Sequence, residues 1–235
     1  MYGWYNGPMG GPNGASGAGR RGGRQSGGSV RAVSETTSRD RLLEAAIAAI
    51  ESGGEVAVRV DEVADAAAVA KPSLYHHFGD REGLIAAAQA ERYRRTLLVD
   101  LEPTIRALEA CTSAPEAQAI VRDWLATFSS AEGTRRRRIR QEVLGSSVSR
   151  PGLAVAVAET NARATADLSR FVELLQERGW ATTAFGAETI ARWFHGLWNG
   201  RYLAELTGDP ADAGAWDELT ATLVLAMLSP DFGAA

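Results

Sequence analysis

Four side chains between positions 71 and 76 bring together a cation, a hydroxyl, a phenol and an imidazole, all of which can hydrogen-bond to nucleic acid. They are Lys71, Ser73, Tyr75 and His76. Their spacing predicts a helix of about two turns that carries these groups on its outward faces. Leu74 and Phe78, four residues apart, supply its inward face. Such a helix can donate to phosphate oxygens and read base edges.

The surrounding residues predict that this helix is the second of a pair. Apolar residues at helical spacing predict a short helix just before it: Val60, Val63, Ala64 and Ala67. Residues 68–70 leave room only for a tight turn. Pro72 stands in the first turn of the second helix, where an amide hydrogen has no intrahelical partner. The pattern is typical of a helix-turn-helix.

The run from Ala64 to Phe78, ADAAAVAKPSLYHHF, followed by DREGL at 80–84, resembles the DNA-binding signature of the tetracycline-repressor (TetR) family. The similarity extends back to Thr37 and covers roughly residues 37–88. Three positions depart from the family's usual residues: Arg59 replaces a capping Ser or Thr, Ala68 a Gly, and Ala70 a Ser or Thr. Alanine at position 68 predicts either a right-handed backbone there or a small strain cost.

The resemblance implies an all-α fold with two domains and double-stranded DNA as a partner. We expect a three-helix helix-turn-helix DNA-binding domain over 35–83, followed by a helical ligand-binding and dimerisation bundle over 84–235. The residues expected to contact DNA are Arg59, Lys71, Pro72, Ser73, Tyr75, His76 and Arg81. Arg59 offers a cation to a phosphate, and Arg81 lies in the first turn of the next helix, whose positive end favours anions.

Residues 1–34 are rich in glycine, lack apolar periodicity and contain four arginines but no acid. We predict that this tail is disordered and serves as a solvated extension. An arm on the DNA or an RNA-binding segment are the alternatives. Residues 35–100 hold eight basic and twelve acidic residues, so DNA affinity must depend on few phosphate contacts and on dimerisation.

The remaining sequence predicts helices only, with no period-2 strand pattern. The expected ranges are 81–101, 115–131, 134–147, 153–178, 187–206 and 216–228. The last two carry apolar stripes at helical spacing. The family resemblance implies that these two helices pair with those of a second copy. The alternative is that both stripes fill the core of the bundle.

The middle helices carry a candidate pocket for an unknown small-molecule effector, formed by aromatic walls and a few polar groups. The candidate residues are Trp124, Phe128, Asn161, Phe171, Trp193, His195 and Trp198. For each aromatic residue, simple core packing is the competing interpretation. The ligand class and the operator sequence do not follow from these residues.

Other function classes find little support. No apolar run approaches the length of a membrane span, the N-terminal residues lack an apolar signal region, and Cys111 is the single cysteine, which favours a cytoplasmic protein. No metal-ligand spacing, catalytic motif or cofactor motif is present. We therefore expect a ligand-released, homodimeric repressor that binds a palindromic operator. An all-helical small-molecule-binding protein or enzyme, and a tail-driven RNA-binding module, remain as alternatives.

Overall fold

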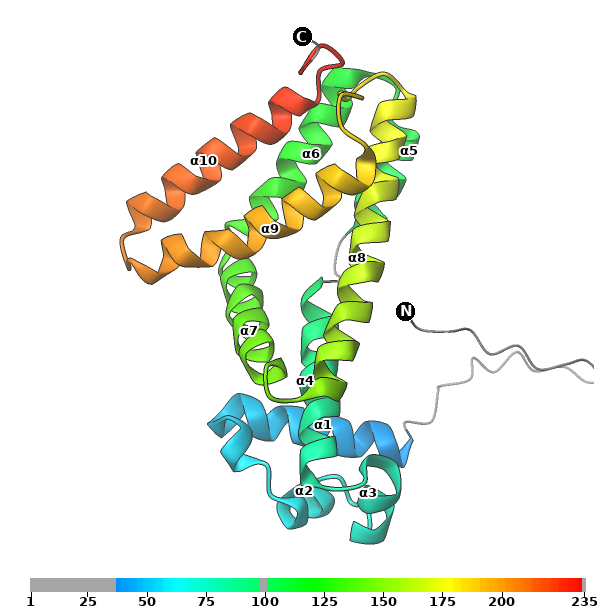
Figure 1. Cartoon of the computed structure of the whole chain (residues 1–235), viewed down its shortest axis with the longest axis vertical. Coiled ribbons are helices and arrows are strands. Elements are labelled where there is room, and N and C mark those ends of the chain that lie inside the picture. Colours follow the sequence, from blue (N-terminus) through cyan, green and yellow to red (C-terminus); the bar gives the residue numbers. More distant parts are fainter. Residues whose placement is uncertain (1–36, 98–100, 234–235) are drawn as a thin grey trace, which may run out of the picture. The chain divides into compact units, whose positions relative to one another are not determined.

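The computed structural model describes residues 37–97 and 101–233. The chain divides into Met1–Glu35 and Thr36–Ala235, and the predicted disordered tail lies outside the described residues. Helices account for all regular structure in the described part, which confirms the all-α prediction (Figure 1). They are α1 (Ser38–Gly53), the 3-10 helix η1 (Glu55–Ala57), α2 (Val60–Ala66), α3 (Lys71–Phe78), α4 (Arg81–Leu97), α5 (Leu101–Ala110), α6 (Ala114–Phe128), α7 (Ala131–Ser147), α8 (Pro151–Glu177), α9 (Ala187–Leu206) and α10 (Pro210–Met227).

Helix α1 begins at a reciprocal cap. The Thr37 hydroxyl accepts from the Asp40 amide at 3.2 Å, while the Asp40 carboxylate accepts from the Thr37 amide at 3.2 Å. The two bonds satisfy donors that a helix start leaves unpaired. This helix buries an apolar stripe at helical spacing: Leu42, Leu43, Ala46, Ile47 and Ile50. It packs with Leu74 of α3 and with α4 as far as Ala88, beyond the predicted domain boundary at 83.

Helix α4 belongs to both halves of the chain. Its first turns pack on α1 and α3, and it continues between α7 and α8 (Figure 1). Its start is capped by Asp80, whose carboxylate accepts from the Gly83 amide at 2.7 Å. The predicted end at 101 is wrong, because α4 ends at Leu97 and a separate helix, α5, begins at Leu101. Pro103 then lies in the first turn of α5, where proline is tolerated.

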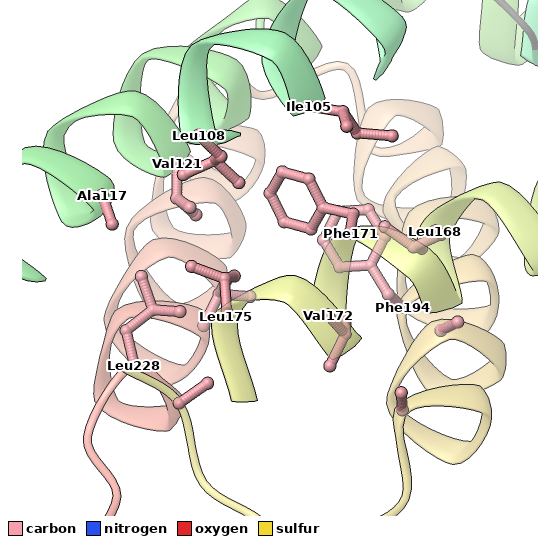
Figure 2. Packing of buried hydrophobic residues seen from close by; sticks show 14 of the residues in the cluster. Ile105, Leu108, Ala117, Val121, Leu168, Phe171, Val172, Leu175, Phe194 and Leu228 are labelled. Carbon is pink, nitrogen blue, oxygen red and sulfur yellow. The ribbon is translucent and has the colours of Figure 1, made fainter. Parts of the chain in front are cut away.

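The bundle has its own core among α5, α6, α8, α9 and α10. Figure 2 shows aliphatic side chains of these helices packed around Phe171 and Phe194. The long helix α8 contacts α4 as well as α9. A separate buried cluster joins α4 to α7 and α8 and consists of Tyr93, Ile139, Val143, Leu153 and Val157. None of the described helices has the length and apolar character needed to cross a membrane.

Candidate DNA-binding and ligand-binding sites

Helix α3 presents its polar groups outward as the sequence predicts. Leu74 is fully buried, whereas Lys71, Tyr75 and His76 are exposed, with half of Tyr75 accessible. Pro72 is exposed in the first turn and Ser73 is half-buried. The face that could meet a duplex therefore carries a cation, a phenol and an imidazole.

Acidic neighbours pair with both cations of the helix-turn-helix. Lys71 Nζ lies 2.7 Å from Asp61, and Arg59 Nη1 lies 3.2 Å from Glu62. The hydrogen bond to Asp61 raises the pKa of the Lys71 ammonium. Both pairs are exposed, where ion pairs contribute little and exchange readily. A phosphate can therefore replace the carboxylate as the partner of either cation, at the cost of separating the existing pair.

Arg81 has a structural task. Its Nε donates to the Val58 carbonyl at 2.8 Å, and its Nη2 donates to the Glu55 carbonyl at 2.7 Å. These bonds fasten the segment that enters α2 to the start of α4. The remaining nitrogen pairs with Glu82. The predicted phosphate contact of Arg81 stays a prediction, and it requires that the guanidinium serve both purposes.

The turn between α2 and α3 is strained at the position where alanine replaces glycine. Ala68 has a φ of +51°, the left-handed conformation that clashes with a Cβ atom. Of the two alternatives left by the sequence, the strain cost is therefore correct. We expect Ala68→Gly to raise the free energy of unfolding by about 1 kcal/mol, measured by urea denaturation. Ala48→Gly, at an exposed position inside α1, is the control and should lower the free energy of unfolding.

A polar network joins the helix-turn-helix to the bundle. The Glu55 carboxylate accepts from Gln89 of α4 at 2.7 Å, from Ser146 of α7 at 2.7 Å and from Arg150 at 2.8 Å. Arg150 also reaches Glu82 at 3.0 Å. The network fixes the start of α2 and α4 to the loop between α7 and α8.

Six helices, α4 to α9, line a partly open cavity of about 250 Å³ that we call the bundle pocket. Four of the predicted residues line it: Trp124, Phe128, His195 and Trp198. The aromatic rings pack closely, with the Trp124 and Phe128 centroids 4.7 Å apart. Burial, and then the charge of Arg140, lower the pKa of His195, so its imidazole is neutral at pH 7. Its Nδ1 lies 3.2 Å from the Thr165 hydroxyl.

The other three predicted residues do not line the bundle pocket. Phe171 is buried in the core against Trp124. Asn161 accepts from the Tyr93 hydroxyl at 2.8 Å. Trp193 is 41% exposed, because its neighbour Phe194 takes the inward face of α9 and the next residue of a helix points about 100° away.

Sequence reasoning missed two arginines of α7. Arg137 is fully buried and Arg140 is 3% exposed, and each guanidinium carbon lies 5.2 Å from the centre of the Trp198 ring. The run from Arg135 to Arg138 reads as a solvated helix start. However, the buried positions 133, 137, 140 and 143 follow helical spacing. The sequence therefore contains a signal for a buried stripe, but only if arginine is accepted as a buried residue.

No group of three or more potential ligands that could hold a metal ion occurs among the residues described. The site is therefore characterised by an exposed helix face with paired cations and by an aromatic pocket with a buried guanidinium.

Comparison with known proteins matches this geometry. Residues 42–88 match the family model described as bacterial regulatory proteins, tetR family. No curated protein matches the chain.

Solved structures share the fold. A protein from Rhodococcus sp. assigned to the TetR-family transcriptional regulators has 23% identity and a TM-score of 0.60, covering 82% of this chain and 98% of its own. One from Mesorhizobium loti has 21% identity and a TM-score of 0.61, covering 81% and 95%. A regulator from Saccharomonospora viridis in complex with choline has 16% identity and a TM-score of 0.54, covering 77% and 91%. Residues 42–88 are therefore similar to the DNA-binding domain of the tetR family, and the described helices share the fold of solved structures assigned to TetR-family transcriptional regulators.

Proposed function

We propose that the protein is a homodimeric repressor that binds a palindromic operator and is released by a small molecule. The observation that carries the proposal is the outward face of α3, with Lys71, Tyr75 and His76 exposed inside the segment that matches the family model. Two such helices, one from each copy, enter successive major grooves about 34–36 Å apart. Tyr75 and His76 then face base edges, while Lys71 and Arg59 neutralise phosphates.

Helix α4 offers a physical route from ligand to DNA. It begins at Arg81, which fastens the helix-turn-helix, and its last turn places Thr96 and Leu97 in the wall of the bundle pocket. A ligand that fits only one position of this last turn holds α4 in that position, and this changes the separation of the two α3 helices in the dimer. It acts as an effector because it binds one state more tightly than the other. The choline complex of a similar fold supports a ligand site in a bundle of this kind.

The outer surfaces of α9 and α10 support assembly with a second copy. Large apolar side chains lie in solvent there: Trp193, Leu203, Leu206, Leu219 and Leu223. Gly196, on the exposed side of α9, has no atom within 4 Å of where a Cβ would stand, which lets another helix approach closely. Exposed apolar surface of this extent favours an interface. We propose that the last two helices form it.

The proposal assigns no chemical reaction to the chain. Its partner is chromosomal DNA, so we place the protein in the cytoplasm.

Selection from a random duplex DNA library, by the purified chain with and without residues 1–34, tests the proposal. Enrichment of the same inverted repeat by both forms is the expected result. Enrichment lost with the tail, together with retained RNA binding by the full chain, favours the RNA-binding alternative. No enrichment from either form at low and moderate salt contradicts sequence-specific binding.

Asp61→Asn should strengthen operator binding roughly twofold to fivefold, because Lys71 is then free for a phosphate without breaking its 2.7 Å ion pair. Lys71→Ala should weaken binding to all sequences alike, whereas Tyr75→Ala should relax preference at one base position. Fluorescence anisotropy with the selected operator and a scrambled duplex measures both effects. Glu51→Gln, which removes one negative charge at an exposed position of α1, is the charge-matched control. Equal gains from Asp61→Asn and Glu51→Gln contradict the local competition.

A further inference from the structure

Three buried arginines of α7 and α9 lie close together: Arg137, Arg140 and Arg201. Among the described residues, two acids form ion pairs with members of this group, Glu205 and Asp217. Arg201 pairs with Asp217, and both Arg137 and Arg201 bind the Glu205 carboxylate. Arg140 has no carboxylate partner in the described part of the chain. Glu205 Oε2 also lacks a hydrogen-bond partner, so this acid acts on Arg140 through its charge and not through a hydrogen bond.

The unpaired atoms of Arg140 form one edge of the guanidinium. Nε and Nη2 are both buried without a hydrogen-bond partner among the described residues. Arg201 uses the same two nitrogens to hold Asp217, with N–O distances of 2.5 Å and 2.6 Å. A carboxylate matches this edge because its two oxygens accept two parallel hydrogen bonds. The carboxylate of Asp217 on Arg201 is therefore an example, within this chain, of the kind of partner that Arg140 lacks.

Arg140 stays charged despite its burial, and its surroundings limit what can pair with it. Burial lowers its pKa to about 9, which leaves the guanidinium protonated at neutral pH. The acidic side chains that line the bundle pocket are Glu102, which pairs with Arg106 at 3.2 Å, and Asp167. Neither forms an ion pair with Arg140. An unpaired buried charge is costly, so the site favours an anion from outside.

The rest of the pocket selects the body of such an anion. Trp124, Phe128, Phe194 and Trp198 present apolar aromatic surface, and His195 is neutral. A volume of about 250 Å³ accommodates a small molecule. Arg140 forms part of the wall, with the two unpaired nitrogens shielded from solvent. A ligand must therefore enter and draw the guanidinium toward itself.

We propose that the bundle pocket binds a small carboxylic acid with an apolar or aromatic body, whose carboxylate pairs with Nε and Nη2 of Arg140. The inference rests on the proposed function only in treating this pocket as the effector site. Pairing moves a side chain of α7, which packs on α4, so the same contact gives the acid a different affinity for the two positions of α4.

Calorimetric binding to the full chain, without DNA, tests this assignment. The probes are 3-phenylpropanoate and phenylacetate, their uncharged amides, and choline as a cation. We expect the acids to bind at least roughly tenfold more tightly than the amides, because a paired charge adds to the shared apolar contact. Arg140→Met should abolish this preference while leaving the chain folded, and Arg135→Gln, exposed on the same helix, should preserve it.

Acid binding that is unaffected by Arg140→Met, equal binding of acids and amides, or no acid binding at millimolar concentration overturns the proposal. Binding of choline in preference to the acids does so as well. The DNA selection is independent of these results. An operator found without acid binding removes the ligand class alone, whereas acid binding without an operator removes the repressor function alone.

Discussion

Glu205→Leu is expected to lower the free energy of unfolding by about 3–5 kcal/mol, because it leaves buried arginines without their shared carboxylate. Glu205 accepts from Arg137 Nε at 2.8 Å and also binds Arg201, while Arg137 itself is fully buried. The Phe128 carbonyl, 2.7 Å from Arg137 Nη1, satisfies one donor but neutralises no charge. Urea denaturation followed by far-ultraviolet circular dichroism measures the loss.

Two further variants make that prediction specific. Glu188→Leu removes an exposed acid of the same helix, the partner of Arg192, and should change stability by no more than about 0.5 kcal/mol. The double variant Arg137→Met/Glu205→Leu should recover most of the loss, because replacing both partners by apolar groups is nearly neutral. Similar losses for Glu188→Leu and Glu205→Leu would show that burial of the pair is not the cause.

The second large effect concerns assembly. Replacing both Leu219 and Leu223 by arginine should convert the protein to a monomer and weaken operator binding by about 100-fold or more, because the second half-site then binds independently. These side chains are 59% and 38% exposed in the single chain, so the change does not disturb its core. Analytical ultracentrifugation reports the assembly and anisotropy reports the affinity.

Val155→Arg provides the matched control, since Val155 is also 59% exposed but lies on α8. It should leave both assembly and affinity unchanged. A double variant that stays dimeric would move the interface away from α10. A monomer that retains full operator affinity would show that assembly does not contribute to DNA binding.

The helix-turn-helix was predictable because its local signals agree with its packing. Thr37 and Asp40, three residues apart, form a reciprocal cap of the kind that this spacing favours, and Leu74 is fully buried as the inward residue of α3. The exposed positions of Lys71, Tyr75 and His76 follow from that single fact, since burying Leu74 fixes the orientation of a short helix. Their contacts with DNA stay predictions, because exposure says nothing about what a face binds.

The bundle was harder to predict because the roles of its side chains depend on contacts between distant helices. Trp193 and Phe194 are adjacent aromatics on α9, and only the packing of α6 and α8 decides which one is buried. Arg137 and Arg140 occupy apolar positions of a helical stripe, and their tolerance there depends on Glu205, Trp198 and the pocket. No local pattern contains that information.

Helix α4 runs without interruption from Arg81 beside the helix-turn-helix to Leu97 at the bundle pocket. This continuity has a consequence for the effector concentration at which the protein responds. Under the proposed function, thermodynamic reciprocity requires that operator DNA weaken ligand binding by the same factor by which the ligand weakens DNA binding. Operator-bound protein therefore needs a higher effector concentration than free protein. The effector concentration needed for release thus rises with the strength of operator binding, so the threshold is not a property of the pocket alone.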